Sequence, residues 1–119
     1  MKKYFTLWVL LLCGTFAASA SGLWTRKNDF AGNPRDRSIS FSIGDFGYYG
    51  CGNHYGGSAE MGDMWKYDPT TDSWMQISDY PLGMQAGEVF VLNDQGYVGS
   101  GWRSGYSFSD WYRYDPLSN

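Results

Sequence analysis

The sequence predicts an all-β fold assembled from a repeated unit of about 50 residues. Two motifs carry the repeat. The stretch DMWKYDP at residues 63–69 returns as DWYRYDP at residues 110–116, and GYYGCG at residues 47–52 returns as GYVGSG at residues 96–101. Aromatic residues make up 19% of the chain, which also contains 16 glycines. This composition is typical of short strands joined by tight turns.

Each unit opens with a strand that we expect to be buried on one face. Residues 38–43 alternate polar and apolar side chains, which puts Ile39, Phe41 and Ile43 on the same face. Residues 87–92 are the less regular counterpart. A polar turn containing Asp and Gly follows each strand, and these residues tolerate the left-handed backbone of a tight hairpin.

The second strand of each unit is rich in glycine. Gly50 and Gly52 in the first unit correspond to Gly99 and Gly101 in the second. Glycine inside a strand indicates that another backbone approaches closely. The alternative, a phosphate-cradling loop, would require a lysine and a following helix, and the sequence indicates neither.

The third and fourth strands follow a longer loop. Pro69 and Pro116 end the third strands, because proline cannot continue a hydrogen-bonded ladder. Trp74 begins the predicted fourth strand of the first unit, and we expect it to pack between neighbouring units. Asp29 and Phe30 follow Trp24 at the same spacing as Asp79 and Tyr80 follow Trp74. Residues 24–27 are therefore predicted to be a stray outer strand.

The order of these strands resembles the kelch repeat family over residues 24–119. A glycine pair, a loop, the pattern Asp-x-aromatic-x-Tyr-Asp-Pro and a trailing tryptophan carry the resemblance. The adjacent double glycine of the family is replaced here by Gly-x-Gly, and Met84 stands where the first unit has Arg35. The resemblance implies kelch-type β-propeller blades, which are four-stranded antiparallel sheets arranged around an axis.

The predicted division of the chain is a signal peptide at residues 1–20 and a partial kelch propeller at residues 21–119. Blade one covers residues 38–77, and blade two covers residues 87–115 and lacks its last strand. Because a ring needs more blades, we expect either a fragment of a longer propeller or several chains that assemble into a ring. The repeated residues expected to be structural are Trp24, Gly50, Gly52, Asp63, Trp65, Tyr67, Asp68, Trp74, Gly99, Gly101, Asp110, Tyr114 and Asp115.

The first twenty residues have the layout of a secretory signal. Lys2 and Lys3 precede a short apolar run, and small residues end at Ala20. A membrane anchor and a lipoprotein modified at Cys13 are the alternatives, but the run is short for a span and Leu12 is large for a lipidation site. We therefore expect export to the periplasm, the cell surface or the medium.

Charge and composition limit the chemistry. Removal of the signal would leave a net charge of −5, which disfavours nucleic acid and anionic lipid as partners. His54 is the only histidine and Cys51 would be the only remaining cysteine, so we expect no internal disulfide, metal site, cofactor or hydrolytic triad. We expect Cys51 to be a small buried residue.

Candidate binding residues lie in the loops that do not repeat. The connection before a blade and the long loop inside it should open on one face, called here the loop face. Arginines and aromatic rings there suit a sugar, a carboxylated sugar or a peptide, although they could simply cap the surface. These residues are Arg35, Arg37, Asn53, His54, Tyr55, Trp102, Arg103 and Tyr106.

The favoured function is an exported kelch-repeat binding module that recognises a protein or glycan without chemistry. The alternative is the N-terminal piece of a propeller enzyme that acts on sugars and resembles the sialic-acid mutarotases. A truncated product without function is a third interpretation.

Overall fold

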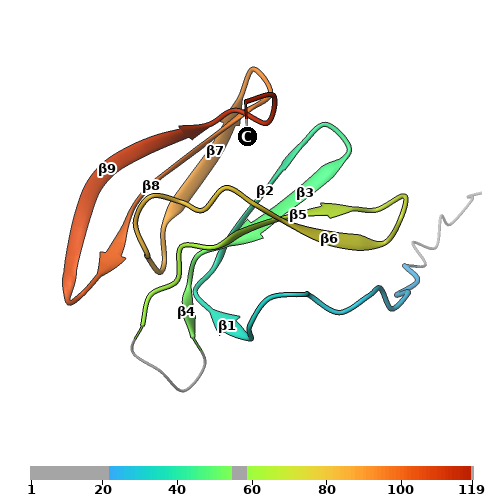
Figure 1. The fold of residues 1–119 in the computed structure, drawn as a ribbon, viewed down its shortest axis with the longest axis horizontal. Helices are drawn as coiled ribbons and strands as arrows, with labels where there is room; N and C mark the ends of the chain where they lie inside the picture. The colour runs from blue at the N-terminus through green and yellow to red at the C-terminus, as the bar shows by residue number, and fades with distance from the viewer. Residues whose placement is uncertain (1–21, 55–58, 119) are drawn as a thin grey trace, which may run out of the picture.

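The computed structural model describes residues 22–54 and 59–118, and these residues form three antiparallel sheets (Figure 1). The predicted signal peptide at residues 1–20 lies outside the described residues, and so does Tyr55. Within the described ranges, no helix is long and apolar enough to cross a membrane. The prediction of an all-β fold is confirmed.

Blade one is a four-stranded antiparallel sheet in the order β2-β3-β5-β6. Its strands are β2 (Ile39–Ile43), β3 (Phe46–Gly50), β5 (Met64–Asp68) and β6 (Ser73–Ile77). A short pair, β1 (Arg35–Asp36) with β4 (Asn53–His54), joins the segment before the blade to its long loop.

Blade two repeats the first three strands of this arrangement. It has the order β7-β8-β9, formed by β7 (Glu88–Leu92), β8 (Gln95–Arg103) and β9 (Tyr106–Tyr114). The register is conserved between the blades: Val98 pairs with Tyr112 as Tyr49 pairs with Trp65. Both blades are therefore of the predicted kelch type.

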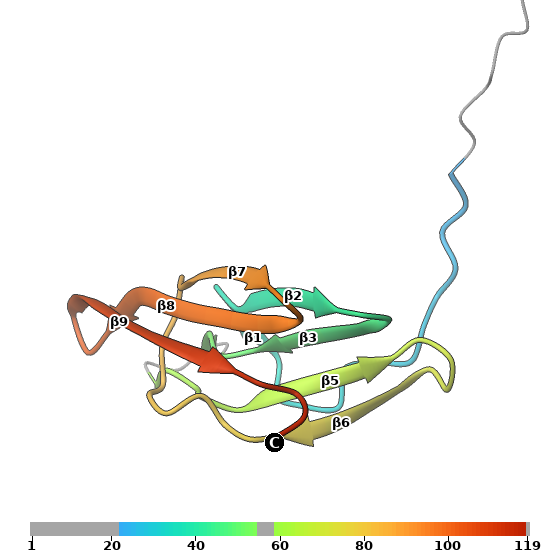
Figure 2. The same ribbon diagram turned by 90° about the horizontal axis from the view of Figure 1, so that it is seen from above.

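The core lies between the two blades, and Figure 2 shows the strands of both blades running roughly alongside one another. The face of blade one that meets blade two carries Ile39, Tyr48 and Met64, all at most 5% exposed. The Tyr48 ring contacts the Tyr114 ring of blade two at a centroid distance of 5.6 Å. Burial of apolar side chains on both sheets holds the layers together.

Two glycines let the third strand of each blade approach closely. A Cβ added to Gly50 would lie 2.3 Å from the carbonyl oxygen of Asp63, and one on Gly99 would lie 2.4 Å from that of Asp110. The residue after each glycine, Cys51 or Ser100, has a positive φ of 52° or 40°. The kelch double glycine is thus replaced at a left-handed position, where glycine is usually favoured.

Cys51 is completely buried, as the sequence predicted. Burial, together with the nearby Asp63 charge, raises the pKa of its thiol to about 12.

Two of the repeated aspartates organise turns. Asp68 accepts a hydrogen bond from the backbone N–H of Thr70 at 2.8 Å, and Asp115 accepts one from that of Leu117 at 3.0 Å. A carboxylate that bonds the N–H two residues ahead forms an Asx-turn. The contacts of Asp68 and Asp115 are therefore structural.

The prediction of an outer strand at residues 24–27 is not met in the structure. These residues form no strand, and Trp24 is 99% exposed. A strand needs a neighbouring edge to satisfy its backbone groups. The segment is instead hydrogen-bonded to blade one through Asn28, which forms three hydrogen bonds of 2.6–3.3 Å with Asp72 in the β5–β6 turn.

Candidate functional site

The predicted loop face lies at one end of the blades, on the side where Figure 1 shows β1, β4 and the β8–β9 hairpin tip. The connection between the blades is fixed there by a backbone bridge. Gln85 and Trp102 each donate an N–H to the carbonyl oxygen of the other, both at 3.0 Å. The β1–β4 pair makes the same kind of link for blade one. These two pairs connect the segments that lead into each blade to the loop or hairpin within that blade.

Arg37 is exposed at this end, in the segment that leads into blade one. Its Nη1 donates a hydrogen bond of 2.6 Å to Oε1 of Gln85, whose side chain is 7% exposed. The Arg37 carbonyl oxygen also accepts from the N–H of Ala86 at 2.8 Å. A guanidinium has five N–H donors, and this contact uses one of them. Arg37 is thus positioned by Gln85 with donors left for a ligand.

Arg35 was expected beside Arg37, but the structure places it in an ion pair with Asp63. Nη1 and Nη2 of Arg35 each lie 2.7 Å from an oxygen of Asp63, and the Arg35 side chain is 1% exposed. The Phe30 ring covers the guanidinium at 4.9 Å. Bidentate pairing is the strongest contact available to this side chain. Arg35 is therefore a structural residue and does not contribute to the exposed loop face.

This environment favours the ionised form of Asp63 and lowers its pKa. Its partial burial acts to raise the pKa, but hydrogen bonds from Arg35 and Trp65 and the charge of Arg35 outweigh that effect and lower it. Trp65 contributes its Nε1–H, which donates at 2.6 Å. The ion pair and the tryptophan together hold the start of β5 against β1.

The β8–β9 hairpin carries the other candidates. Trp102 is 43% exposed and Tyr106 is 78% exposed, with the exposed Arg103 between them. The turn is held by Glu60, whose Oε1 accepts from the Ser104 N–H at 3.0 Å. That hydrogen bond lowers the pKa of Glu60. The hairpin thus presents two rings and a cation on a fixed turn.

The remaining candidates lie on β4, where Asn53 is half-buried and His54 is exposed. Sequence reasoning missed Gln85 and Glu60, which fix the loop face. The sequence could have indicated Gln85, because this polar residue follows Met84, which stands at the repeat position of Arg35. Among the described residues, no group of three metal-ligating side chains is close enough to hold an ion.

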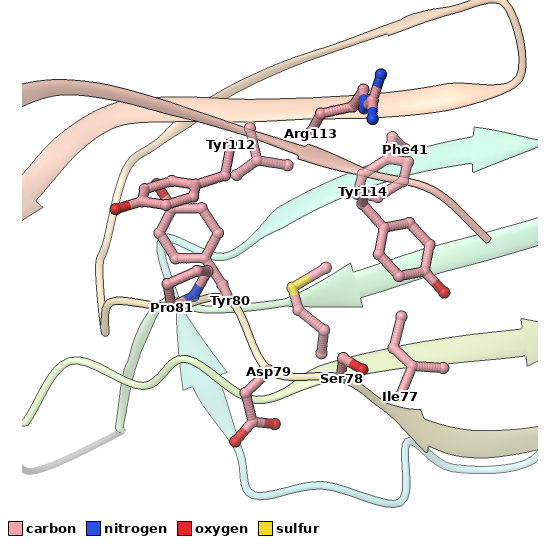
Figure 3. A pocket seen from close by; sticks show the side chains of 11 residues that line it. Phe41, Ile77, Ser78, Asp79, Tyr80, Pro81, Tyr112, Arg113 and Tyr114 are labelled. Carbon is pink, nitrogen blue, oxygen red and sulfur yellow. The ribbon is translucent and has the colours of Figure 1, made fainter. Parts of the chain in front are cut away.

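A cavity of about 200 Å³ lies between the blades, away from the loop face. Figure 3 shows Tyr80 and Tyr112 on one side of it and Tyr114 on the other. The Tyr80 and Tyr112 rings meet edge to face at 5.2 Å. Burial raises the pKa of Tyr80 to about 12, so the phenol is neutral at ordinary pH. The lining of the cavity is mainly aromatic and aliphatic, and Asp79 and Arg113 are its charged members.

Comparisons with known proteins identify similar chains. No family model matches. The chain is 37% identical over 82 residues to the N-acetylneuraminate epimerase of Escherichia coli O157:H7, an alignment that covers 66% of this chain and 22% of that protein. It is 34% identical over 82 residues to the N-acetylneuraminate epimerases of Escherichia coli K12 and Shigella boydii serotype 4, with the same coverage.

A solved structure, that of YjhT, is similar in fold. It has a TM-score of 0.58 and 34% sequence identity, and the match covers 66% of this chain and 24% of that one. The chain spans about a fifth of the length of the curated relatives that it matches. With the two blades described above, these similarities support a kelch-like β-propeller. The curated proteins that it resembles are N-acetylneuraminate epimerases.

Proposed function

We propose that this chain is part of an exported propeller that acts on a sialic-acid-type sugar, and that its loop face helps to bind the carboxylate of that sugar. The observation that carries the proposal is the 37% identity to an N-acetylneuraminate epimerase over 82 residues. These relatives favour an enzyme over a binding module without chemistry. Export rests on the signal-like layout of residues 1–20.

The chemistry of the loop face fits such a ligand. N-acetylneuraminate carries a carboxylate, which a guanidinium binds through charge-assisted hydrogen bonds. Arg37 is the exposed guanidinium that Gln85 positions, whereas Arg35 is already paired with Asp63. Exposed rings such as Trp102 can pack against the apolar face of a sugar. We assign carboxylate recognition to Arg37.

The test measures the affinity of the full chain for N-acetylneuraminate by NMR titration. We expect Arg37→Gln to weaken binding about 10- to 100-fold, since a hydrogen bond to a charged group contributes about 1.5–3 kcal/mol. Arg26→Gln is the matched control, because Arg26 is an exposed arginine in the segment before blade one. The uncharged methyl ester of the sugar serves as the second control.

The proposal predicts that the methyl ester binds as weakly to the unmodified chain as the acid binds to the Arg37→Gln variant. If the ester and the acid bind equally, the carboxylate is not recognised. If Arg37→Gln and Arg26→Gln behave alike, Arg37 is not the residue that recognises it. Either result would overturn the assignment.

A further inference from the structure

The carboxylate of Glu60 joins the long loop of blade one to the β8–β9 turn of blade two, at the end of the molecule where Figure 1 shows β4 and that hairpin. Its Oε1 accepts a hydrogen bond of 3.0 Å from the N–H of Ser104, which is 44 residues away in the sequence. Backbone N–H groups in turns can bind anions. The donor of this turn is thus occupied by a side chain of the protein itself.

Other groups around Glu60 also favour a negative charge there. The hydrogen bond from Ser104 is the largest cause of the lowered pKa of the Glu60 carboxyl, and a hydrogen bond from the Gln85 side chain and the charge of Arg103 lower it further. Glu60 is therefore ionised at ordinary pH. Its carboxylate has the surroundings that a bound anion would require: an N–H, an amide and a nearby guanidinium.

The backbone of Glu60 is fixed by contacts on two sides. Glu60 forms an antiparallel bridge with Asn53, and a Cβ added to Gly83 would lie 2.4 Å from the Glu60 carbonyl oxygen. The next residue, Met61, accepts a hydrogen bond of 3.2 Å from the N–H of Met84. The position of the carboxylate is therefore set by the packing of the long loop on the connection between the blades.

Gln85 separates Glu60 from Arg37. Its Oε1 accepts the hydrogen bond of 2.6 Å from Nη1 of Arg37. A glutamine amide has its acceptor on one atom and its donors on the other, so the Gln85 side chain can accept from Arg37 and donate to Glu60 at the same time. Arg37 is thus bonded to a neutral amide, whereas Arg103 lies near the charge of Glu60.

We propose that Glu60 is a specificity-determining residue, whose carboxylate fills a second anion position one glutamine away from Arg37. The loop face then accepts an acidic sugar with one anionic group and rejects one that carries a further phosphate or carboxylate. This inference rests on the proposed function, in which Arg37 binds the carboxylate of the ligand. A fixed like charge discriminates against a wrong ligand by repulsion.

The first experiment compares two sugars by NMR titration of the full chain: N-acetylneuraminate and the phosphate ester of its terminal hydroxyl group. We expect the unmodified chain to bind the ester at least about tenfold more weakly, because Glu60 repels the second anionic group. Glu60→Gln removes the charge but keeps the size and an acceptor for Ser104. It should bring the two dissociation constants within about threefold of each other.

Glu88→Gln is the matched control for this comparison. Glu88 is an exposed glutamate on β7, and its substitution changes the net charge by the same amount. We expect this variant to discriminate between the two sugars as the unmodified chain does. A general change in the charge of the protein would instead alter both variants alike.

The second experiment tests the anion position without any sugar. Glu60→Ala leaves the Ser104 N–H free, and titration with sodium sulfate is followed at the amide resonance of Ser104. We expect a saturable shift in Glu60→Ala, and no such shift in the unmodified chain or in Glu60→Gln, whose amide oxygen still accepts from Ser104. Sodium chloride at the same ionic strength is the control for screening of charges.

Two results would overturn the role of Glu60. One is equal discrimination between the sugars by the unmodified chain and by Glu60→Gln, a variant that tests the proposal even if Glu60→Ala does not fold. The other is a sulfate-induced shift of Ser104 that is the same with and without Glu60. If the unmodified chain binds neither sugar, the proposed function fails and the restriction on its ligand fails with it. The sulfate signal does not depend on Arg37, so it still shows whether Glu60 fills an anion position.

Discussion

The two blades have nearly the same backbone but treat the same aspartate differently. In blade one, Asp63 is paired with Arg35 through two contacts of 2.7 Å, and Trp65 donates a third. In blade two, Asp110 is exposed, and the position equivalent to Arg35 is the fully buried Met84. The register is the same as far as Gly50 in blade one and Gly99 in blade two, beyond which β8 and β9 continue past an irregularity between Gly99 and Gly101. Glycines and turns therefore define the blade, whereas the ion pair is an addition that belongs to one copy.

Blade one also contains an aromatic cluster in which the Trp74 ring lies 5.1 Å from Phe30 and 4.9 Å from Tyr67, measured between ring centroids. Three substitutions would break or sharpen these differences.

The largest effect should come from Trp74→Ala. Removing a large aromatic residue that packs on Phe30 and Tyr67 should cost about 3–5 kcal/mol of unfolding free energy. Urea unfolding followed by circular dichroism measures the loss. Trp24→Ala is the control and should leave the transition unchanged, since Trp24 is 99% exposed. An unaltered transition for Trp74→Ala would show that the cluster does not stabilise blade one.

Arg35→Met should have the next largest effect, because it gives blade one the residue type of blade two. Removing one partner of a covered ion pair leaves Asp63 without its cation, and we expect a loss of about 3 kcal/mol. The matched change in blade two, Asp110→Asn, affects an exposed carboxylate and should change stability by less than about 0.5 kcal/mol. Equal losses at the two positions would contradict the comparison.

The same pair gives a pH dependence with a defined sign. The pKa of Asp63 is lower in the folded chain than its usual value, so the unfolded chain binds the proton more readily. The contribution of Asp63 to stability is therefore complete above the ordinary aspartate pKa of about 3.9, and it is lost as the pH falls through the lower folded value. Unfolding midpoints measured from pH 6 downward should show a smaller acid-induced loss for Asp63→Asn than for the unmodified chain.

The smallest effect of the three should come from Gly99→Ala. The added Cβ would lie 2.4 Å from the Asp110 carbonyl oxygen, so the strands must separate, at a cost of about 1–3 kcal/mol. Thermal unfolding measures this loss of stability. Gly105→Ala has open space around it but a φ of 88°, so it isolates backbone strain from crowding. If the two variants lose the same stability, close approach of the strands is not the reason for glycine at position 99.

The repeat allowed the strands to be predicted closely from the sequence. The expected strand at residues 38–43 became β2 (Ile39–Ile43), and residues 87–92 became β7 (Glu88–Leu92), because alternation of side chains depends only on local geometry. The glycine positions were predictable for the same reason, since both copies show them.

The side-chain contacts of the candidate site could not be predicted in this way. Arg35 meets Asp63 across 28 residues, and no spacing in the sequence reveals such a contact. The sequence did not distinguish Arg35 from Arg37, but in the structure Arg35 is covered and Arg37 is exposed. Residues 24–27 matched the fourth strand in sequence, but a strand also requires an edge, and no sheet edge is paired with them among the described residues.

The reactivity of the buried Cys51 thiol can report local opening of the structure. Its thiol is buried at the junction of the blades and has a pKa of about 12, so the reactive thiolate is scarce while the fold is closed. Opening of the junction would expose the group and restore an ordinary thiol pKa. The rate at which an alkylating reagent modifies Cys51 therefore reports how often this part of the structure opens, without any added label.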